Sequence, residues 1–156
     1  MSYESAREYL AKYSLEDRIH LMQTSTATVA LAALALGCEE ARIAKTLSFL
    51  EDGRVIIIVT AGDVKVDNKK FKEYFHTKAH MIPYEETEEL TGHAPGGVCP
   101  FGLKDGCEVY LDSSLKRFDI VYPAAGTSNS AVKLSPEELE KALPMAKWIS
   151  VTKAIS

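Results

Sequence analysis

The residues whose types are best suited to chemistry lie in one loop rich in glycine and proline, residues 91–102 (TGHAPGGVCPFG). Because Gly96 and Gly97 carry no Cβ atoms, a ligand can come close to the main chain, whose N–H groups can point at an anionic or carbonyl oxygen. Pro95 and Pro100 would stiffen the two flanks of the loop. A plain surface connector is the ordinary alternative for this composition, and the residue types alone leave both interpretations open.

One lysine, Lys45, interrupts an otherwise apolar stretch, residues 43–47 (IAKTL). At the mouth of a pocket, its ammonium group would bind a phosphate as a compact charge on a flexible stem. A lysine on an edge strand that faces water gives the same pattern, and without further context this second interpretation is the more common one.

Three other patterns point more weakly to chemistry. Cys99 and His93 lie in the same loop and could form a thiol–imidazole pair, although cysteine more often packs as a small hydrophobic residue. His76 and His80 have the i, i+4 spacing of metal ligands, but no third ligand is evident, so we expect a solvated helix end and no metal. A cluster of lysines could face water or contact a nucleic-acid backbone: Lys65, Lys69, Lys70, Lys72 and Lys78.

The composition bounds the class of protein. A chain of 156 residues, 46% of them hydrophobic, predicts a single domain over residues 1–156. The 18 basic and 22 acidic residues give a net charge of −4, which excludes a histone-like coat but leaves room for a local basic patch. No apolar run reaches the roughly 18 residues that a membrane span needs, so we expect no membrane partner. Three cysteines without a CxxC pair predict free thiols in a reducing cytoplasm.

The elements that must position these residues mix helices and strands without regular alternation. Apolar periodicity and capping residues predict helices over residues 2–13, 29–36 (short and buried), 69–75 and 85–91, and another that begins at Ser135-Pro136. β-Branched and aromatic runs predict strands over residues 17–22, 43–50, 55–60, 107–111, 118–122 and 148–151. Asp52-Gly53 supplies a hairpin turn. This order predicts an α+β fold with a mostly antiparallel or mixed sheet.

Taken in chain order, several motifs resemble the YbaK/ProX-type aminoacyl-tRNA editing domain family. The lysine in its AKTL context (residues 44–47) and the GxxxP loop (Gly96 to Pro100) are together fairly specific, whereas either alone would be weak. Small residues at Ala125-Gly126 and the helix start over residues 134–139 (LSPEEL) extend the similarity. It covers most of the chain, from about the second helix to the C-terminus.

The resemblance implies both a fold and an activity. Members of this family are trans-editing deacylases, or editing domains attached to prolyl-tRNA synthetase, and they hydrolyse the ester that joins a wrong amino acid to tRNA. Their fold is a compact mixed sheet, partly barrel-like, with helices packed around it. The sequence is therefore expected to form a free-standing deacylase that removes a small mischarged amino acid, with tRNA-Pro as the expected tRNA.

The resemblance also assigns roles to residues. The family's lysine falls on Lys45, which would hold the phosphate near the tRNA 3′ end, and the GxxxP loop would present backbone groups to the aminoacyl carbonyl and the attacking water. Lys45 and Gly96 are the expected catalytic residues. The expected substrate-binding residues are Thr26, Thr46, His93, Gly97, Val98, Cys99, Pro100 and Gly126.

The expected chemistry is simple because an aminoacyl ester is already activated. Fixed N–H donors and a positioned water suffice, so we expect no metal, no cofactor and no covalent enzyme intermediate. The expected partners are the 3′ acceptor end of aminoacyl-tRNA and a synthetase such as prolyl-tRNA synthetase. Two alternatives stay open: a non-catalytic, synthetase-associated or small-ligand binding module with the same pocket, and a thiol hydrolase that uses Cys99 and His93.

Overall fold

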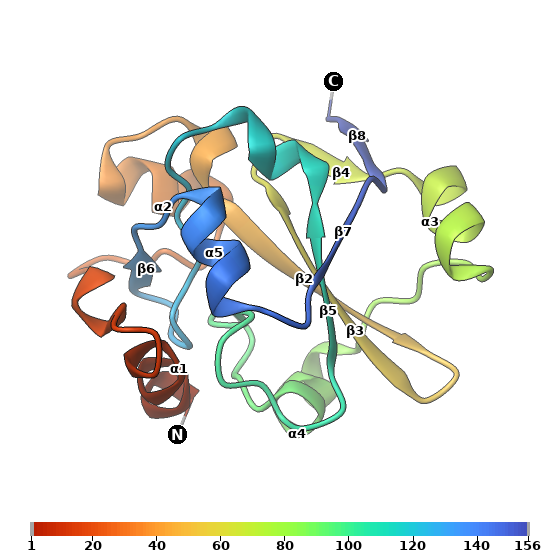
Figure 1. Cartoon of the computed structure of the whole chain (residues 1–156), viewed down its shortest axis with the longest axis horizontal. Helices are drawn as coiled ribbons and strands as arrows, with labels where there is room; N and C mark the ends of the chain where they lie inside the picture. Colours follow the sequence, from red (N-terminus) through yellow and green to blue (C-terminus); the bar gives the residue numbers. More distant parts are fainter. Residues whose placement is uncertain (1, 156) are drawn as a thin grey trace.

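A four-stranded mixed sheet forms the centre of the computed structural model, which describes residues 2–155 (Figure 1). The strand order is β2 (Ala44–Glu51), β3 (Arg54–Ala61), β5 (Glu108–Asp112) and β7 (Lys147–Ile149). β2 and β3 are antiparallel, whereas β3, β5 and β7 run parallel to one another. β2 is thus an edge strand, and the sheet is mixed, as the sequence predicts.

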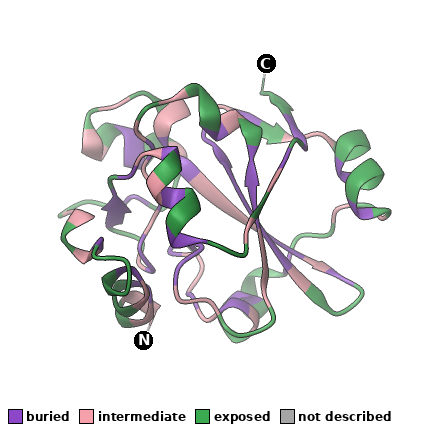
Figure 2. Cartoon of the chain, in the orientation of Figure 1, coloured by how far each residue is buried: buried purple, intermediate pink, exposed green. Residues whose placement is uncertain are grey.

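The hairpin between β2 and β3 forms where the Asp-Gly pair predicts it. Asp52 and Gly53 have φ angles of 50° and 80°, the left-handed values that a tight two-residue turn requires. β3 is almost wholly buried (Figure 2), because apolar clusters cover both faces of the sheet. One cluster packs Val59 of β3 against Leu10 and Leu139, and the other packs Ile58 against Phe71.

Two small antiparallel sheets flank the central one. β1 (Ile19–Leu21) pairs with β6 (Ser130–Val132), and β4 (Val64–Val66) pairs with β8 (Thr152–Ala154). Across residues 2–155 the strands therefore form three separate sheets rather than a closed barrel. The predicted α+β class with a mixed sheet is confirmed. The sheets of the described residues do not close into a barrel.

Capping residues explain where the helices begin. The α-helices are α1 (Ser2–Ala11), α2 (Val29–Leu36), α3 (Asn68–Phe75), α4 (Thr87–Thr91) and α5 (Pro136–Ala142). Short 3-10 helices cover Glu16–Arg18, Glu40–Arg42, Tyr84–Glu86 and Ser113–Arg117. Thr28 and Asp67 accept hydrogen bonds from the first turns of α2 and α3, and Ser135 forms a capping box with Glu138.

No helix within residues 2–155 is long and apolar enough to cross a membrane.

Three predictions of local structure need correction. The segment 118–122 is not a strand, because it makes only isolated bridges, such as the one between Val121 and Leu134. α2 is not a buried helix: the side chain of Leu34 is 81% exposed, and only Ala32 and Ala33 are buried. The strand predicted over residues 17–22 begins as a 3-10 helix and is extended only over β1.

Candidate functional site

A cavity of about 340 Å³ opens beside the first residues of β2, between α2, β6 and the loop after α4. Five of the predicted site residues line it: Thr26, Lys45, Thr46, Gly96 and Val98. They come from segments up to 72 positions apart in the sequence, so the fold alone brings them together. Lys45 and the glycine-rich loop thus share one cavity, which is the arrangement that an anchored ester substrate requires.

Lys45 is half-buried, and its Nζ donates a hydrogen bond to the carbonyl of Val64. Burial lowers the pKa of this lysine, and the nearby negative charge of Asp63 partly opposes the effect. An ammonium group has three donors, so two are left for a ligand. The geometry therefore suits an anion held at the cavity by a partly desolvated cation.

Gly96 and Gly97 are required for two different reasons. Gly96 has a φ angle of +87°, which side chains rarely adopt, although a Cβ atom there would be 3.5 Å from that of Ala27, an ordinary contact. A Cβ atom on Gly97 would lie only 2.7 Å from the main chain of Gly126 and Thr127. The main chain of the neighbouring loop therefore fills the space beside Gly97. The missing Cβ atom at Gly97 makes room for this loop and not, as expected from the sequence, for a ligand.

The main chain of the loop keeps donors available at the cavity. The N–H of Gly97 is used internally, since it donates to the carbonyl of Ala94 at 3.0 Å. The N–H groups of Gly96 and Val98 form no hydrogen bond with any other of residues 2–155, and both residues line the cavity. Because they have no acceptor of their own and belong to lining residues, these two N–H groups are the loop's candidate donors for a developing oxyanion.

Two threonines of the lining have different hydrogen bonding. The Thr26 hydroxyl donates to the carbonyl of Ser130 at 2.9 Å, and its N–H donates to the carbonyl of Ser128 at 2.6 Å. Thr26 therefore ties the segment before α2 to the loop before β6. The Oγ1 atom of Thr46 is buried without a partner among the described residues. A buried hydroxyl without a partner is costly. Thr46 lines the cavity, but this oxygen has almost no accessible surface, so the predicted contact of Thr46 with substrate stays a prediction.

His93, Gly97, Cys99, Pro100 and Gly126 do not line this cavity within residues 2–155. His93 is fully buried behind the loop, with Nε2 donating to the carbonyl of Phe101 at 2.6 Å and Nδ1 lying 2.9 Å from the Ser2 hydroxyl. The Ser2 hydroxyl lies within hydrogen-bond distance of both this nitrogen and the carbonyl of Gly126, and its one proton is available to either acceptor. These residues hold the loops in place, and their predicted contacts with substrate stay predictions.

The thiol of Cys99 is fully buried and lies 3.5 Å from Nε2 of His93. The predicted thiol–imidazole contact therefore exists, but it lies away from the cavity. Burial raises the pKa of this thiol to about 12, and burial also lowers the pKa of His93. Both groups are thus neutral near pH 7, which argues against a thiolate nucleophile.

The two histidines with metal-like spacing do not form a metal site. α3 ends at Phe75 and His76 has a φ angle of 62°, so His76 and His80 do not share a helix. Nδ1 of His80 lies 2.6 Å from the Glu51 carboxylate instead. Among residues 2–155, no group of three or more histidines, cysteines or carboxylates could hold a metal ion.

Sequence reasoning missed the walls of the cavity. Val29 and Ala32 of α2 form one side, and Tyr122 and Ala131 form another. The alanine-rich sequence of α2 predicts a helix of small residues. It does not predict that this helix lies beside β2. Nothing local in the sequence indicates that residues 122–131 pack against that strand.

The fold and the cavity agree with a comparison to known families. The model of the aminoacyl-tRNA editing domain matches residues 23–142, so the chain belongs to that family. The resemblance seen in the AKTL and GxxxP motifs is thereby confirmed. The matched region contains every lining residue of the cavity, whereas α1 precedes it.

Individual relatives extend this similarity. The chain is 49% identical over 154 residues to the uncharacterized protein YwhH of Bacillus subtilis, with 98% of both chains covered. It is 30% identical over 110 residues to a protein of Enterococcus faecalis named "Putative Cys-tRNA(Pro)/Cys-tRNA(Cys) deacylase EbsC", covering 69% of this chain and 66% of that one. A crystal structure described as "a putative trans-editing enzyme for prolyl tRNA synthetase" superposes with a TM-score of 0.87 at 28% identity, with 98% of both chains covered.

Proposed function

We propose that this protein is a free-standing aminoacyl-tRNA deacylase, and that one editing domain over residues 1–156 carries the activity. It hydrolyses the ester between a small mischarged amino acid and tRNA. One observation carries the proposal: Lys45, Gly96 and Val98 line a single cavity in a chain of the editing-domain family, and the N–H groups of Gly96 and Val98 have no acceptor among residues 2–155.

The proposed mechanism assigns a separate task to each group. The ammonium of Lys45 binds the phosphate nearest the tRNA 3′ end, and the ester carbonyl points toward the N–H groups of Gly96 and Val98. Water adds to the carbonyl carbon, the two N–H groups stabilise the negative charge that forms on oxygen, and the ribose oxygen leaves with a proton. The products are the free amino acid and deacylated tRNA. Oxyanion donors of this kind contribute about 3 kcal/mol each to catalysis.

The cavity walls support a small acyl group as substrate. Ala32, Ala131 and Val98 line the cavity with small apolar side chains, and the loop at residues 127–131 contributes no ionisable side chain. Small amino acids are also the ones that synthetases discriminate poorly, because one methylene changes selectivity only about 10- to 200-fold. A deacylase that clears them supplies the missing selectivity.

The proposed tRNA is tRNA-Pro, and the proposed protein partner is prolyl-tRNA synthetase. The names of EbsC and of the structurally similar trans-editing enzyme support both assignments. A tRNA substrate also supports a cytoplasmic location, because aminoacylation takes place there. The catalysis proposed here needs no metal, so chelation with EDTA should leave the deacylation rate unchanged.

Deacylation of a panel of mischarged tRNAs tests the proposal. We expect alanyl-, cysteinyl- or seryl-tRNA-Pro to lose its amino acid faster with the protein than in buffer. Lys45→Ala should reduce kcat/KM at least about 100-fold through loss of the charged contact. Lys141→Ala, on the exposed side of α5, is the control and should keep full activity. If no ester in the panel is cleaved faster than in buffer, the protein is the non-catalytic binding module instead.

A further inference from the structure

Positive charge is concentrated on one part of this acidic protein. Four exposed lysines lie on β4, on the first turn of α3 and on β8, and we call them the lysine surface: Lys65, Lys69, Lys70 and Lys153. The chain as a whole has a net charge of −4. Such a local reversal of sign attracts a polyanion even where the whole molecule does not.

The two strands of this surface place like charges opposite each other. Lys65 and Lys153 are direct partners in the antiparallel register of β4 and β8, so their side chains leave the same face of the small sheet. Like charges in that position repel and destabilise the pairing. A bound anion between the two ammonium groups would remove this repulsion.

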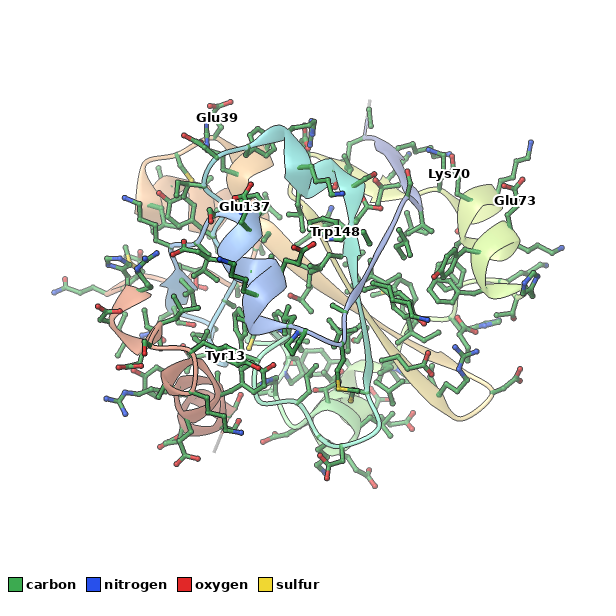
Figure 3. The ribbon with its side chains drawn as sticks, viewed as in Figure 1. Tyr13, Glu39, Lys70, Glu73, Glu137 and Trp148 are labelled. Atoms are coloured by element: carbon green, nitrogen blue, oxygen red, sulfur yellow. The ribbon has the colours of Figure 1, made fainter. Side chains whose placement is uncertain are left out.

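The helix end of the surface is fixed next to the strands. Nζ of Lys70 donates to the carbonyl of Thr152 at 3.1 Å, which ties α3 to β8. Asp67 lies nearby, and its Oδ1 accepts hydrogen bonds from the N–H groups of Lys69 and Lys70 at 3.0 and 3.2 Å. Its negative charge also interacts with Lys70 and Lys153, so the carboxylate offsets part of the positive charge of the surface. Figure 3 shows Lys70 on the side of α3 nearer β8, with Glu73 farther out on the helix.

One end of the lysine surface adjoins, along the chain, the contact that holds Lys45. The carbonyl that accepts the hydrogen bond from Lys45 belongs to Val64, and Lys65 is the next residue of β4. From there β4 runs toward α3 (Figure 1). The path that this order suggests for a chain of phosphates runs from Lys45 past Lys65 and Lys153 to the first turn of α3.

We propose that the lysine surface binds the sugar–phosphate backbone of the tRNA acceptor stem whose 3′ end occupies the cavity. This inference rests on the deacylase function proposed above. Exposed lysines act as point charges on phosphates and read no bases, so the surface contributes affinity and orientation while the choice of tRNA lies elsewhere.

The test compares two triple variants of the full chain. Lys65→Gln/Lys69→Gln/Lys153→Gln removes charge from the surface but spares the Lys70–Thr152 hydrogen bond. The control, Lys12→Gln/Lys116→Gln/Lys141→Gln, removes three exposed lysines from other elements. Fluorescence anisotropy with an acceptor-stem minihelix should show binding weakened about tenfold or more in the surface variant, and a slope of log K against log[salt] shallower by roughly 2 to 3. The control variant should match the native protein.

Smaller probes separate this inference from the deacylase function. Hydrolysis of 3′-alanyl-adenosine, which has no stem, should be unchanged in the surface variant, whereas kcat/KM for alanyl-tRNA should fall. Because Lys65 and Lys153 repel each other, this variant should also unfold at an equal or higher temperature than the native chain. If no ester is hydrolysed at all, the proposed function fails, and the anisotropy experiment still decides whether the surface binds RNA.

Three outcomes would overturn the inference. The first is equal minihelix affinity and salt slope in the native and surface-variant proteins. The second is an equal loss in the surface and control variants, which would indicate a non-specific effect of net charge. The third is a loss of binding to phosphatidylglycerol vesicles with unchanged minihelix binding, which would assign the surface to a membrane.

Discussion

Lys45 combines a partly buried ammonium group with a hydrogen bond to a main-chain carbonyl. Burial disfavours the charged form, so this lysine loses its proton at a lower pH than the ordinary value of 10.5. A phosphate bound beside it would restore the charged form, because opposite charges stabilise each other. In the proposed function, affinity for the substrate phosphate would therefore depend on the protonation of this single residue.

A pH titration of binding tests that dependence. The affinity for an amide-linked analogue of 3′-alanyl-AMP, which cannot be hydrolysed as an ester, should be constant at low alkaline pH and fall as the pH rises through the pKa of Lys45. The midpoint should lie below 10.5. Lys45→Arg keeps its charge throughout this range, so its affinity should not fall. A native profile that is flat to pH 11 would contradict the assignment of Lys45 as the phosphate anchor.

Cys99 supplies a second prediction at the scale of one residue. Its thiol stays protonated because burial raises its pKa to about 12. Cys99→Ala should keep deacylase activity within about twofold while lowering the free energy of unfolding by roughly 1 kcal/mol, because it leaves a small void. Deacylation rates and urea unfolding measure the two effects. A large loss of turnover in a variant that remains folded would revive the thiol mechanism.

Two loops near the cavity, one that contains Gly97 and one that contains Gly126, pack main chain against main chain, with no room for a side chain between these two residues. Neither loop has regular secondary structure, and each is held by the other's backbone. A change of volume at this contact is therefore transmitted from one loop to the other rather than absorbed by a side chain.

Alanine substitutions at the two neighbouring glycines should separate these roles. Gly97→Ala forces apart backbones that leave only 2.7 Å for the new Cβ, and we expect a loss of about 2 to 3 kcal/mol of stability together with most of the activity. Gly96→Ala should cost about 1 to 2 kcal/mol, from its positive φ angle alone. Urea unfolding of both variants provides the measurement. Equal stability of Gly97→Ala and the native chain would show that the loops can move apart freely.

Elements with strong local signals could be predicted from the sequence, whereas three of the five three-residue strands within residues 2–155, β4, β6 and β8, could not. The capping box at Ser135, the turn at Asp52 and the apolar run of β3 each encode their structure within a few residues. β4 and β6 are three residues long, too short to show a period, and they exist because distant partners pair with them. Their absence from the predicted strands follows from that dependence.

At the scale of the whole molecule, the buried carboxylate of Asp112 links three segments. It accepts hydrogen bonds from the N–H of Ser114 at 3.0 Å, the N–H of Val151 at 2.9 Å and the hydroxyl of Thr152 at 2.7 Å. The end of β5 is thereby joined to the chain that enters β8. The lysine surface depends on this link, because Lys153 follows Thr152 directly.

Asp112→Ala should leave these three buried donors without partners. We expect a loss of roughly 2 to 4 kcal/mol in the free energy of unfolding, since each such donor carries a desolvation penalty. Urea unfolding measures this loss, and hydrogen exchange should show faster exchange at the amide of Val151. The exposed variant Asp105→Ala is the control and should be neutral. Unchanged protection of Val151 would show that β8 is held by other contacts.

The candidate site itself could be predicted in its parts but not in its assembly. The AKTL and GxxxP motifs identify Lys45 and Gly96 from the sequence. Which residues reach the cavity and which lie behind the loop depends on how the segments at residues 26–32, 43–47 and 122–131 converge. That convergence comes from long-range packing, which no local pattern encodes.

The first turn of α1 lies directly behind the loops that shape the cavity. A Cβ atom on Gly126 would be 2.4 Å from the Ser2 carbonyl oxygen, and one on Gly102 would be 2.4 Å from that of Ser5. α1 precedes residues 23–142, the part of the chain that the family model matches. A gene trimmed to residues 23–142 would therefore encode these loops without the helix that packs behind them, and we expect a protein of that length to lose the shape of the cavity.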